Sequence, residues 1–254
     1  MRLALAGKGG VGKTTVAALA ISCLVGKGYR PLLAVDADPN ANLGEALGLG
    51  TELTVADILR EVIRGDLPAG LAKDDYISLR IRRALAEGED IDLLVMGGPE
   101  GPGCYCYANN ILRRLIDELS GGYKATVLDN EAGLEHLSRR TTGCADALVV
   151  VSDPTVRGVR LAHRIANLAR ALDLPIGSYY LVVNKVVVGS EEALGEEIGR
   201  TGLSCLGNVP YDPAVAACDL TGRPLTTLPE TSPACAAVGT IVERLIERCR
   251  SPKW

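Results

Sequence analysis

A glycine-rich segment near the amino terminus constrains the fold of this chain more than any other feature. Residues 7–15 read GKGGVGKTT, a glycine followed by four residues, a second glycine, lysine and threonine. The aliphatic run Leu3–Ala6 precedes the segment, and a helical pattern over Lys13–Val25 follows it. This pattern between a strand and a helix is typical of loops that bind the phosphates of nucleotides. It therefore predicts an α/β protein with the P-loop fold.

Strand and helix patterns alternate along the rest of the chain. Further strands are predicted at Leu32–Asp36, Leu93–Met96, Ala125–Asp129, Ala147–Val151, Tyr180–Val183 and Cys205–Asn208. Helices are predicted at Val55–Arg64, Asn110–Leu119, Val156–Leu172, Glu191–Arg200 and Ala234–Cys249. This alternation predicts a mostly parallel sheet wrapped by helices, and we expect residues 1–254 to form one P-loop ATPase domain. Residues 65–90 are charged and weakly periodic, and we expect them to form a helical excursion over the sheet.

Composition and charge narrow the possible partners. Hydrophobic residues make up 47% of the chain and phenylalanine is absent, so the core must be aliphatic, as in parallel sheets buried on both faces. The net charge is −4 without a long basic block, which argues against nucleic acid as a partner. No apolar run approaches the roughly 20 residues that cross a bilayer, and no signal peptide precedes the first strand. We therefore expect a cytoplasmic protein with no nucleic acid and no membrane as partner.

The glycine-rich loop is expected to hold Mg-ATP. Its glycines allow backbone N–H groups to curl around an anion at the positive end of the following helix. Lys13 is expected to bridge the outer phosphates, and the Thr14 hydroxyl to ligate Mg²⁺. The predicted nucleotide contacts in this loop are Gly9, Gly10, Val11, Gly12, Lys13, Thr14 and Thr15.

Aspartates close two of the predicted strands. Asp36 and Asp38 end the second strand, and Asp129 ends the strand that begins at Ala125. The carboxyl ends of parallel strands meet at one edge of the sheet, so these carboxylates should lie beside the phosphates. Asp129 is expected to hold Mg²⁺ through its water shell, and Gly133 to let the following loop respond to the γ-phosphate. Asp36 is expected near Mg²⁺ or as a loop tether, with capping of the next helix as the alternative.

The loop contains a second lysine, Lys8, that a generic P-loop does not require. With it, residues 8–15 resemble the deviant Walker A motif of the MinD/ParA/nitrogenase iron protein group. The resemblance implies that Lys8 reaches across a homodimer interface and stabilises the phosphoryl group that is transferred in the partner. It also implies that Asp38 is the switch aspartate that orients the attacking water. The expected catalytic residues are therefore Lys8, Lys13 and Asp38.

The same resemblance extends to the base of the nucleotide. Asn184 and Lys185, after a predicted strand, resemble the asparagine segment with which the group reads adenine, since an amide can both donate to and accept from the base edge. Pro210 and Tyr211 resemble the loop that covers the base. An asparagine at the end of a strand is also an ordinary turn residue, so this alternative stays open.

Two of the eight cysteines, Cys104 and Cys106, lie close together in a loop rich in glycine and proline. A disulfide between residues so close in sequence is strained, whereas both thiolates can face one metal. Two ligands are too few for Zn²⁺ or Ni²⁺, but a twofold axis would bring together four sulfurs. An ordinary pair of thiols on a surface loop is the alternative. All eight cysteines are expected to be reduced.

Residues 98–113 and 129–140, together with the nucleotide motifs, resemble the CooC/AcsF family of nickel-insertion ATPases. The resemblance implies that one Ni²⁺ or Zn²⁺ is held between two subunits by Cys104 and Cys106. It further implies that ATP drives nickel delivery to a client enzyme, carbon monoxide dehydrogenase or acetyl-CoA synthase.

Two other functions remain open on the sequence. A partitioning or positioning ATPase would act on DNA or a membrane, for which a basic surface or tail is typical. An electron-transfer ATPase would hold an iron–sulfur cluster at the dimer axis, for which four thiolates are suitable. The mixed charges of the last helix argue against the first function, and the close spacing of the cysteine pair argues against the second.

Overall fold

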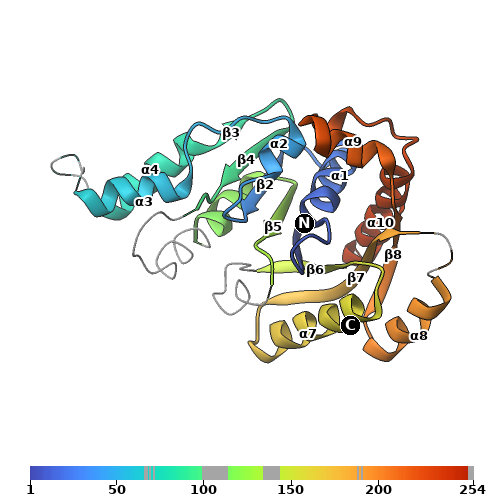
Figure 1. Ribbon diagram of the computed structural model, residues 1–254. Coiled ribbons are helices and arrows are strands. Elements are labelled where there is room, and N and C mark those ends of the chain that lie inside the picture. The colour runs from blue at the N-terminus through green and yellow to red at the C-terminus, as the bar shows by residue number, and fades with distance from the viewer. Residues whose placement is uncertain are drawn as a thin grey trace.

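The computed structural model describes residues 1–65, 68, 70, 72–98, 114–133, 144–187, 189 and 191–250, with the backbone alone at 191–193 and 250. Its centre is an eight-stranded sheet in the order β3-β4-β2-β5-β1-β6-β7-β8 (Figure 1). Every pairing is parallel except that of β3 with β4. The strands are β1 (Arg2–Gly7), β2 (Leu32–Ala37), β3 (Ala86–Glu87), β4 (Ile91–Val95), β5 (Ala125–Asn130), β6 (Ala145–Ser152), β7 (Ile176–Val186) and β8 (Ser204–Pro210).

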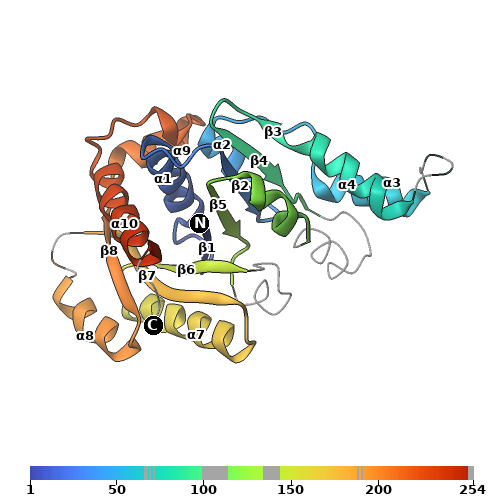
Figure 2. The same cartoon turned by 180° about the vertical axis from the view of Figure 1, so that it is seen from behind.

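Helices cover both faces of this sheet (Figure 2). Those of the described chain are α1 (Lys13–Gly26), α2 (Leu43–Leu47), α3 (Val55–Arg64), α4 (Lys73–Ala84), α7 (Val156–Ala171), α8 (Glu191–Thr201), α9 (Pro213–Thr221) and α10 (Pro233–Arg250), with 3-10 turns η1 (Ser120–Gly122) and η2 (Leu225–Thr227). Residues 114–119 are also helical, which confirms the described part of the helix predicted at Asn110–Leu119. The apolar side chains of α1, α2, α9 and α10 share one core cluster, and those of α3, α4, α7 and α8 share the other.

The strands divide their side chains between these two cores. In β2 every residue is buried, with Leu33 and Val35 in one cluster and Leu32 and Ala34 in the other. This alternation follows from the period of two in a strand and explains why the strands read as unbroken aliphatic runs. β1 lies between β5 and β6, so the loop after it emerges at the middle of the sheet's carboxyl edge.

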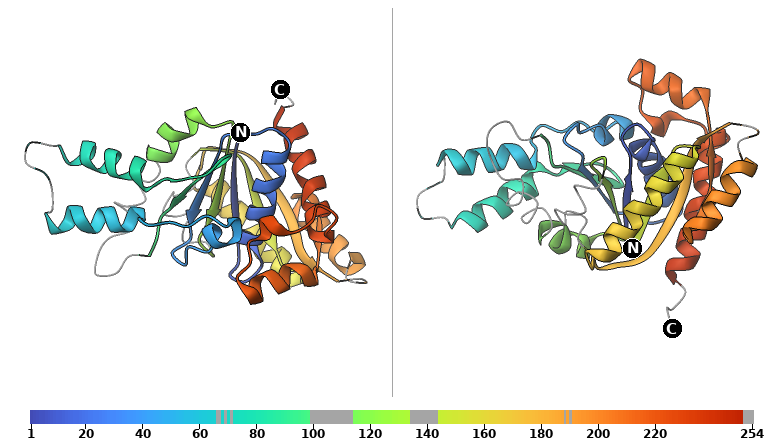
Figure 3. Two further views of the ribbon diagram at one scale, coloured as in Figure 1. Left: turned by 90° about the horizontal axis from the view of Figure 1, so that it is seen from above. Right: turned by 60° about the horizontal axis from the view of Figure 1, so that its bottom comes forward.

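The mostly parallel sheet and all the predicted strands are confirmed, but the expectation for residues 65–90 needs correction. They contain α4 and the antiparallel edge strand β3, and α3 and α4 form a hairpin that extends beyond the β3–β4 edge instead of lying over the sheet (Figure 3). Ile77 and Ile81 are buried in the same core cluster as the apolar face of α3, and Arg80 pairs with Glu61 at 2.6 Å. The pairing of two amphipathic helices thus explains why the segment leaves the sheet.

Of the helices in the described part of the chain, none combines the length and the apolar character needed to cross a membrane.

Candidate nucleotide site

The phosphate loop joins β1 to α1, and glycine is required at its end. Gly12 has φ +88°, in the left-handed region, and directly precedes α1. A Cβ atom at this position would lie 2.3 Å from Nδ2 of Asn184, too close for any side chain. Both observations explain why the loop ends in glycine, since only glycine adopts such a backbone without a penalty.

The loop's lysine, its threonine and the aspartate of β5 meet at the start of α1. The Thr14 hydroxyl donates to Oδ2 of Asp129 at 2.6 Å. The Asp129 side chain is buried, and its other oxygen, Oδ1, has no hydrogen-bond partner among the described residues. Lys13 is also buried and donates weakly to the carbonyl of Lys8 at 3.4 Å. An unpartnered carboxylate oxygen beside a hydroxyl fits the hard oxygen ligands that Mg²⁺ prefers.

Asp36 acts as a tether for the loop that follows β2. Its carboxylate accepts hydrogen bonds from the backbone N–H of Leu43, at 2.8 Å, and of Asp38, at 3.1 Å. Leu43 is the first residue of α2, so Asp36 holds the start of that helix against the sheet. The half-buried Asp38 accepts from both the backbone and the side chain of Asn40 at 2.9 and 2.8 Å. These bonds tether the loop after β2 and also satisfy the first N–H of the next helix, and a place for Asp36 near Mg²⁺ stays a prediction.

Two carboxylates at the site have raised pKa values. Burial is the largest cause that raises the pKa of Asp36 to about 7 and that of Asp129 to about 6, and the neighbouring carboxylates raise both pKa values further. The Thr14 hydroxyl and Lys13 offset part of this shift at Asp129. Burial and like charge both disfavour the ionised carboxylates, and a bound cation would offset both effects.

We expect the ligand-free protein to lose stability as pH rises from 5 to 8. The pKa of Asp36 is raised on folding, from 3.8 to about 7, so the folded state binds this proton more tightly than the unfolded state. The stabilisation is complete below the unfolded pKa and disappears as pH rises through the folded pKa, a fall of about 2 kcal/mol over this window. Urea unfolding at each pH measures it. Asp36→Asn should reduce the slope and leave the smaller part that comes from Asp129, whose pKa is also raised. An equally steep profile in that variant would contradict the assignment to Asp36.

The loop after β5, which is predicted to respond to the γ-phosphate and is called the second switch below, is anchored where it begins. The N–H of Gly133 donates to the carbonyl of Gly7 at 3.0 Å, and the Asn130 amide donates to the carbonyl of Leu5 at 2.7 Å. The root of the switch is therefore bonded to β1 and to the first residue of the phosphate loop. Residues 134–140 lie outside the described residues, as do Cys104 and Cys106.

The residues predicted to contact the base are brought together, although two of them are bonded to the phosphate loop. Asn184, Lys185, Pro210 and Tyr211 line a cavity of about 170 Å³ that also reaches Thr15. Nδ2 of Asn184 donates to the carbonyl of Val11, and Nζ of Lys185 donates to that of Gly10, both at 2.9 Å. Tyr211 is half exposed at the rim.

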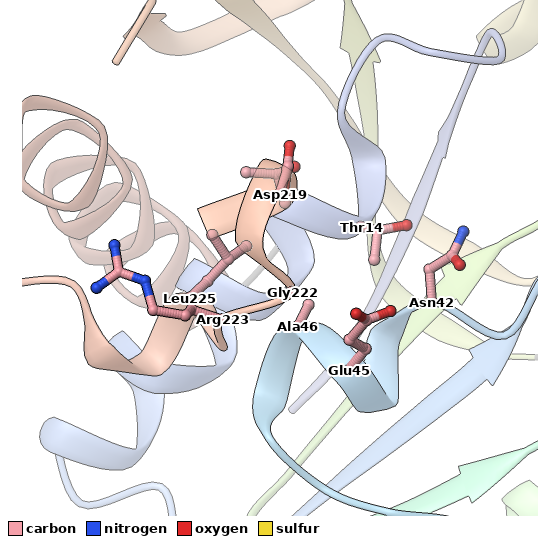
Figure 4. Close-up of a pocket in the computed structure, with 9 residues that line it drawn as sticks. Thr14, Asn42, Glu45, Ala46, Asp219, Gly222, Arg223 and Leu225 are labelled. Carbon is pink, nitrogen blue, oxygen red and sulfur yellow. The ribbon is translucent and has the colours of Figure 1, made fainter. Parts of the chain in front are cut away.

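A second cavity, of about 320 Å³, involves residues that the sequence did not indicate (Figure 4). Thr14 lies near Asn42 and Glu45 of the α2 segment and opposite Asp219 of α9, whereas Arg223 points away from them. Asp219 lines both cavities, so it lies where they adjoin. The sequence of α9 did contain a signal, because Asp212 caps this helix and a proline follows at its first position.

The chain is similar to known nucleotide-binding proteins. Residues 3–225 match the model of the CobQ/CobB/MinD/ParA nucleotide binding domain. The chain is 45% identical to an uncharacterized ATP-binding protein of Methanocaldococcus jannaschii over 98% of this chain and 99% of that protein. It is 33% identical to the carbon monoxide dehydrogenase accessory protein CooC of Rhodospirillum rubrum over 96% of this chain and 97% of that protein.

Among solved structures, the septum site-determining protein MinD from Pyrococcus horikoshii, in complex with Mg-ADP, superposes with a TM-score of 0.71. The two share 21% identity over 98% of this chain and 97% of that one, which shows the common fold.

Proposed function

Because the chain belongs to the CobQ/CobB/MinD/ParA family of nucleotide-binding domains, we propose that it is a Mg²⁺-dependent ATPase that acts as a homodimer and delivers nickel to a client enzyme. The observation that carries the ATPase part is the contact between Thr14 and Asp129. A buried carboxylate, with one oxygen that no described residue donates to, lies beside a hydroxyl and a buried lysine and provides the ligands that Mg-ATP needs.

Each side chain at the site has a defined task in this proposal. Thr14 and Asp129 would hold Mg²⁺, which, when bound, offsets the charge of the phosphate oxygens. Lys13 would exchange its weak bond to the Lys8 carbonyl for stronger contacts to the outer phosphates. Asp38 would orient the attacking water, and Lys8 of one chain would stabilise the transferring phosphoryl group in the other. Asn184, Pro210 and Tyr211 would enclose the base.

The metal part of the proposal rests on the cysteine pair and on a relative. Four thiolates from two chains would hold one Ni²⁺ or Zn²⁺ at Cys104 and Cys106. The relative at 33% identity is named as an accessory protein of carbon monoxide dehydrogenase, and the match spans almost the full length of both chains. We therefore propose that the metal is cargo for carbon monoxide dehydrogenase or acetyl-CoA synthase.

The structure offers a physical link between the nucleotide and the cysteine loop. The strand that leads into this loop, β4, ends at Val95, and the N–H of the next residue, Met96, donates to the carbonyl of Asp36 at 2.8 Å. Met96 in turn accepts from the N–H of Ala56, in the first turn of α3, at 2.9 Å. Gly98 lies against Pro39, because a Cβ at Gly98 would be 3.5 Å from the Pro39 carbonyl oxygen. A shift of residues 36–39 on nucleotide binding would thus displace residues 96–98, the root of the cysteine loop. This contact supports reciprocal coupling of metal and nucleotide.

Anaerobic titration of the reduced protein with Ni²⁺, followed by mass measurement in solution, tests the metal part. We expect one nickel per two chains, and we expect Cys104→Ala or Cys106→Ala to abolish both tight binding and metal-dependent dimerisation. Cys144→Ala is the matched control, because Cys144 is an exposed free thiol elsewhere in the chain. Nickel binding that is unchanged in both Cys104→Ala and Cys106→Ala would overturn the nickel proposal and favour an ATPase that acts on DNA or a membrane.

A further inference from the structure

Two consecutive carbonyls of the phosphate loop are held by the end of a strand far away in the sequence. Nζ of Lys185 donates to the carbonyl of Gly10, and Nδ2 of Asn184 donates to the carbonyl of Val11, each at 2.9 Å. Both donors belong to β7, which is separated from β1 by β6 in the sheet. The contact therefore depends on the folded sheet.

We propose that Lys185 and Asn184 are positioning residues that orient the N–H groups of Val11 and Gly12 toward the phosphates. The proposal rests on the proposed binding of ATP. In a trans peptide the C=O of one residue and the N–H of the next point in opposite directions. When the carbonyls of Gly10 and Val11 are held toward β7, the following N–H groups must face the opposite side, where an anion can bind.

The contact between Asn184 and the loop is closely fitted. Asn184 is only 4% exposed, and its amide nitrogen would lie 2.3 Å from a Cβ at Gly12. The amide thus occupies the space that the missing side chain leaves. A donor packed this closely fixes the peptide plane between Val11 and Gly12, and an oriented donor binds an anion better than a mobile one.

The backbone of Lys185 provides a second indication. Its φ is +59°, in the left-handed region, which non-glycine residues adopt only at a cost in free energy. Glycine would remove this strain but also the ammonium group. Strain of this kind persists where the surrounding structure imposes it and is concentrated at functional sites. The strained residue, Lys185, is therefore the same residue whose ammonium group is bonded to the carbonyl of Gly10.

This inference changes the role expected for Lys185. The sequence placed Lys185 with Asn184 among the residues that contact adenine. In the structure its ammonium group is bonded to the phosphate loop, whereas Asn184 keeps a second N–H and its oxygen for other partners. Lys185 should therefore affect every ligand that carries a phosphate chain, irrespective of the base.

Calorimetric titration of Lys185→Met with ATP, GTP and inorganic tripolyphosphate, all with Mg²⁺, tests the inference. We expect the affinities for ATP and tripolyphosphate to fall by a similar factor, about tenfold, with the ratio of ATP to GTP affinity unchanged. Lys185→Arg should recover most of the loss. The matched control is Lys124→Met, at an exposed lysine whose backbone is bonded at the opposite edge of the sheet.

A second measurement separates orientation from simple loss of charge. The amide resonance of Val11 should shift in nucleotide-free Lys185→Met, because the carbonyl of the same peptide group loses its donor. An unchanged resonance, or a fall in the ratio of ATP to GTP affinity with unaltered tripolyphosphate binding, would overturn the inference. If the unsubstituted protein binds neither ATP nor tripolyphosphate, the proposed ATPase function fails instead.

Discussion

Replacing Lys8 by methionine is expected to lower kcat for ATP hydrolysis by at least about a hundredfold and to change the affinity for Mg-ATP by less than about threefold. Lys8 is exposed, and its side chain forms no hydrogen bond or ion pair with any residue in the described ranges. It is therefore available to act outside its own subunit. A lysine that meets the phosphates only in the partner contributes to the transition state more than to binding.

Comparison with Lys13→Met makes this test specific. Lys13 is buried in the loop of its own chain, so its loss should weaken Mg-ATP binding as well as hydrolysis. Steady-state hydrolysis and calorimetric binding, measured on both variants and on Lys124→Met, distinguish the two lysines. Mixing Lys8→Met with an Asp38→Asn chain should restore part of the activity, since each mixed dimer retains one intact composite site. Equal losses of binding in the Lys8 and Lys13 variants would contradict a role across the interface.

The central part of the fold could be predicted from the sequence because local patterns decide it. The aliphatic runs of β1, β2 and β5 bury both faces and have no other stable environment, and a glycine-rich turn between a strand and a helix has few structural solutions. The meeting of Thr14 with Asp129 follows from the same logic, since both lie at the carboxyl edge of adjacent strands. For this region sequence and structure agree.

Other parts depend on contacts that no local pattern reveals. α4 has only three buried apolar residues, Ile77, Ile81 and Ala84, and its helical conformation is supported by packing against α3. The bond from Lys185 to Gly10 joins residues 175 positions apart, and the sequence alone could only assign Lys185 to the base by resemblance. Asp219 was missed because no helix was predicted over Pro213–Thr221, where the structure has α9.

Replacement of Gly97 is the second change with a large expected effect. Gly97 has φ +72°, and a Cβ there would lie 2.6 Å from Oγ1 and 2.7 Å from Cβ of Thr54. Thr54 cannot easily move, because it caps α3 and exchanges hydrogen bonds with Asp57. We expect Gly97→Ala to lower the free energy of unfolding by about 3 kcal/mol, from backbone strain and overpacking together.

Gly65→Ala separates the two causes. Gly65, at the other end of α3, has a similar φ of +84° but no atom of the described residues within 4 Å of its Cβ position, so only strain of about 1 kcal/mol is expected there. Urea unfolding of both variants gives the difference, and equal losses would show that the contact with Thr54 is unimportant.

Because Gly97 lies between Met96 and the cysteine loop, Gly97→Ala should also reduce the effect of ATP on nickel affinity, whereas Gly65→Ala should leave it intact. Unchanged coupling in Gly97→Ala would mean that nucleotide and metal communicate by a route that bypasses the root of the loop.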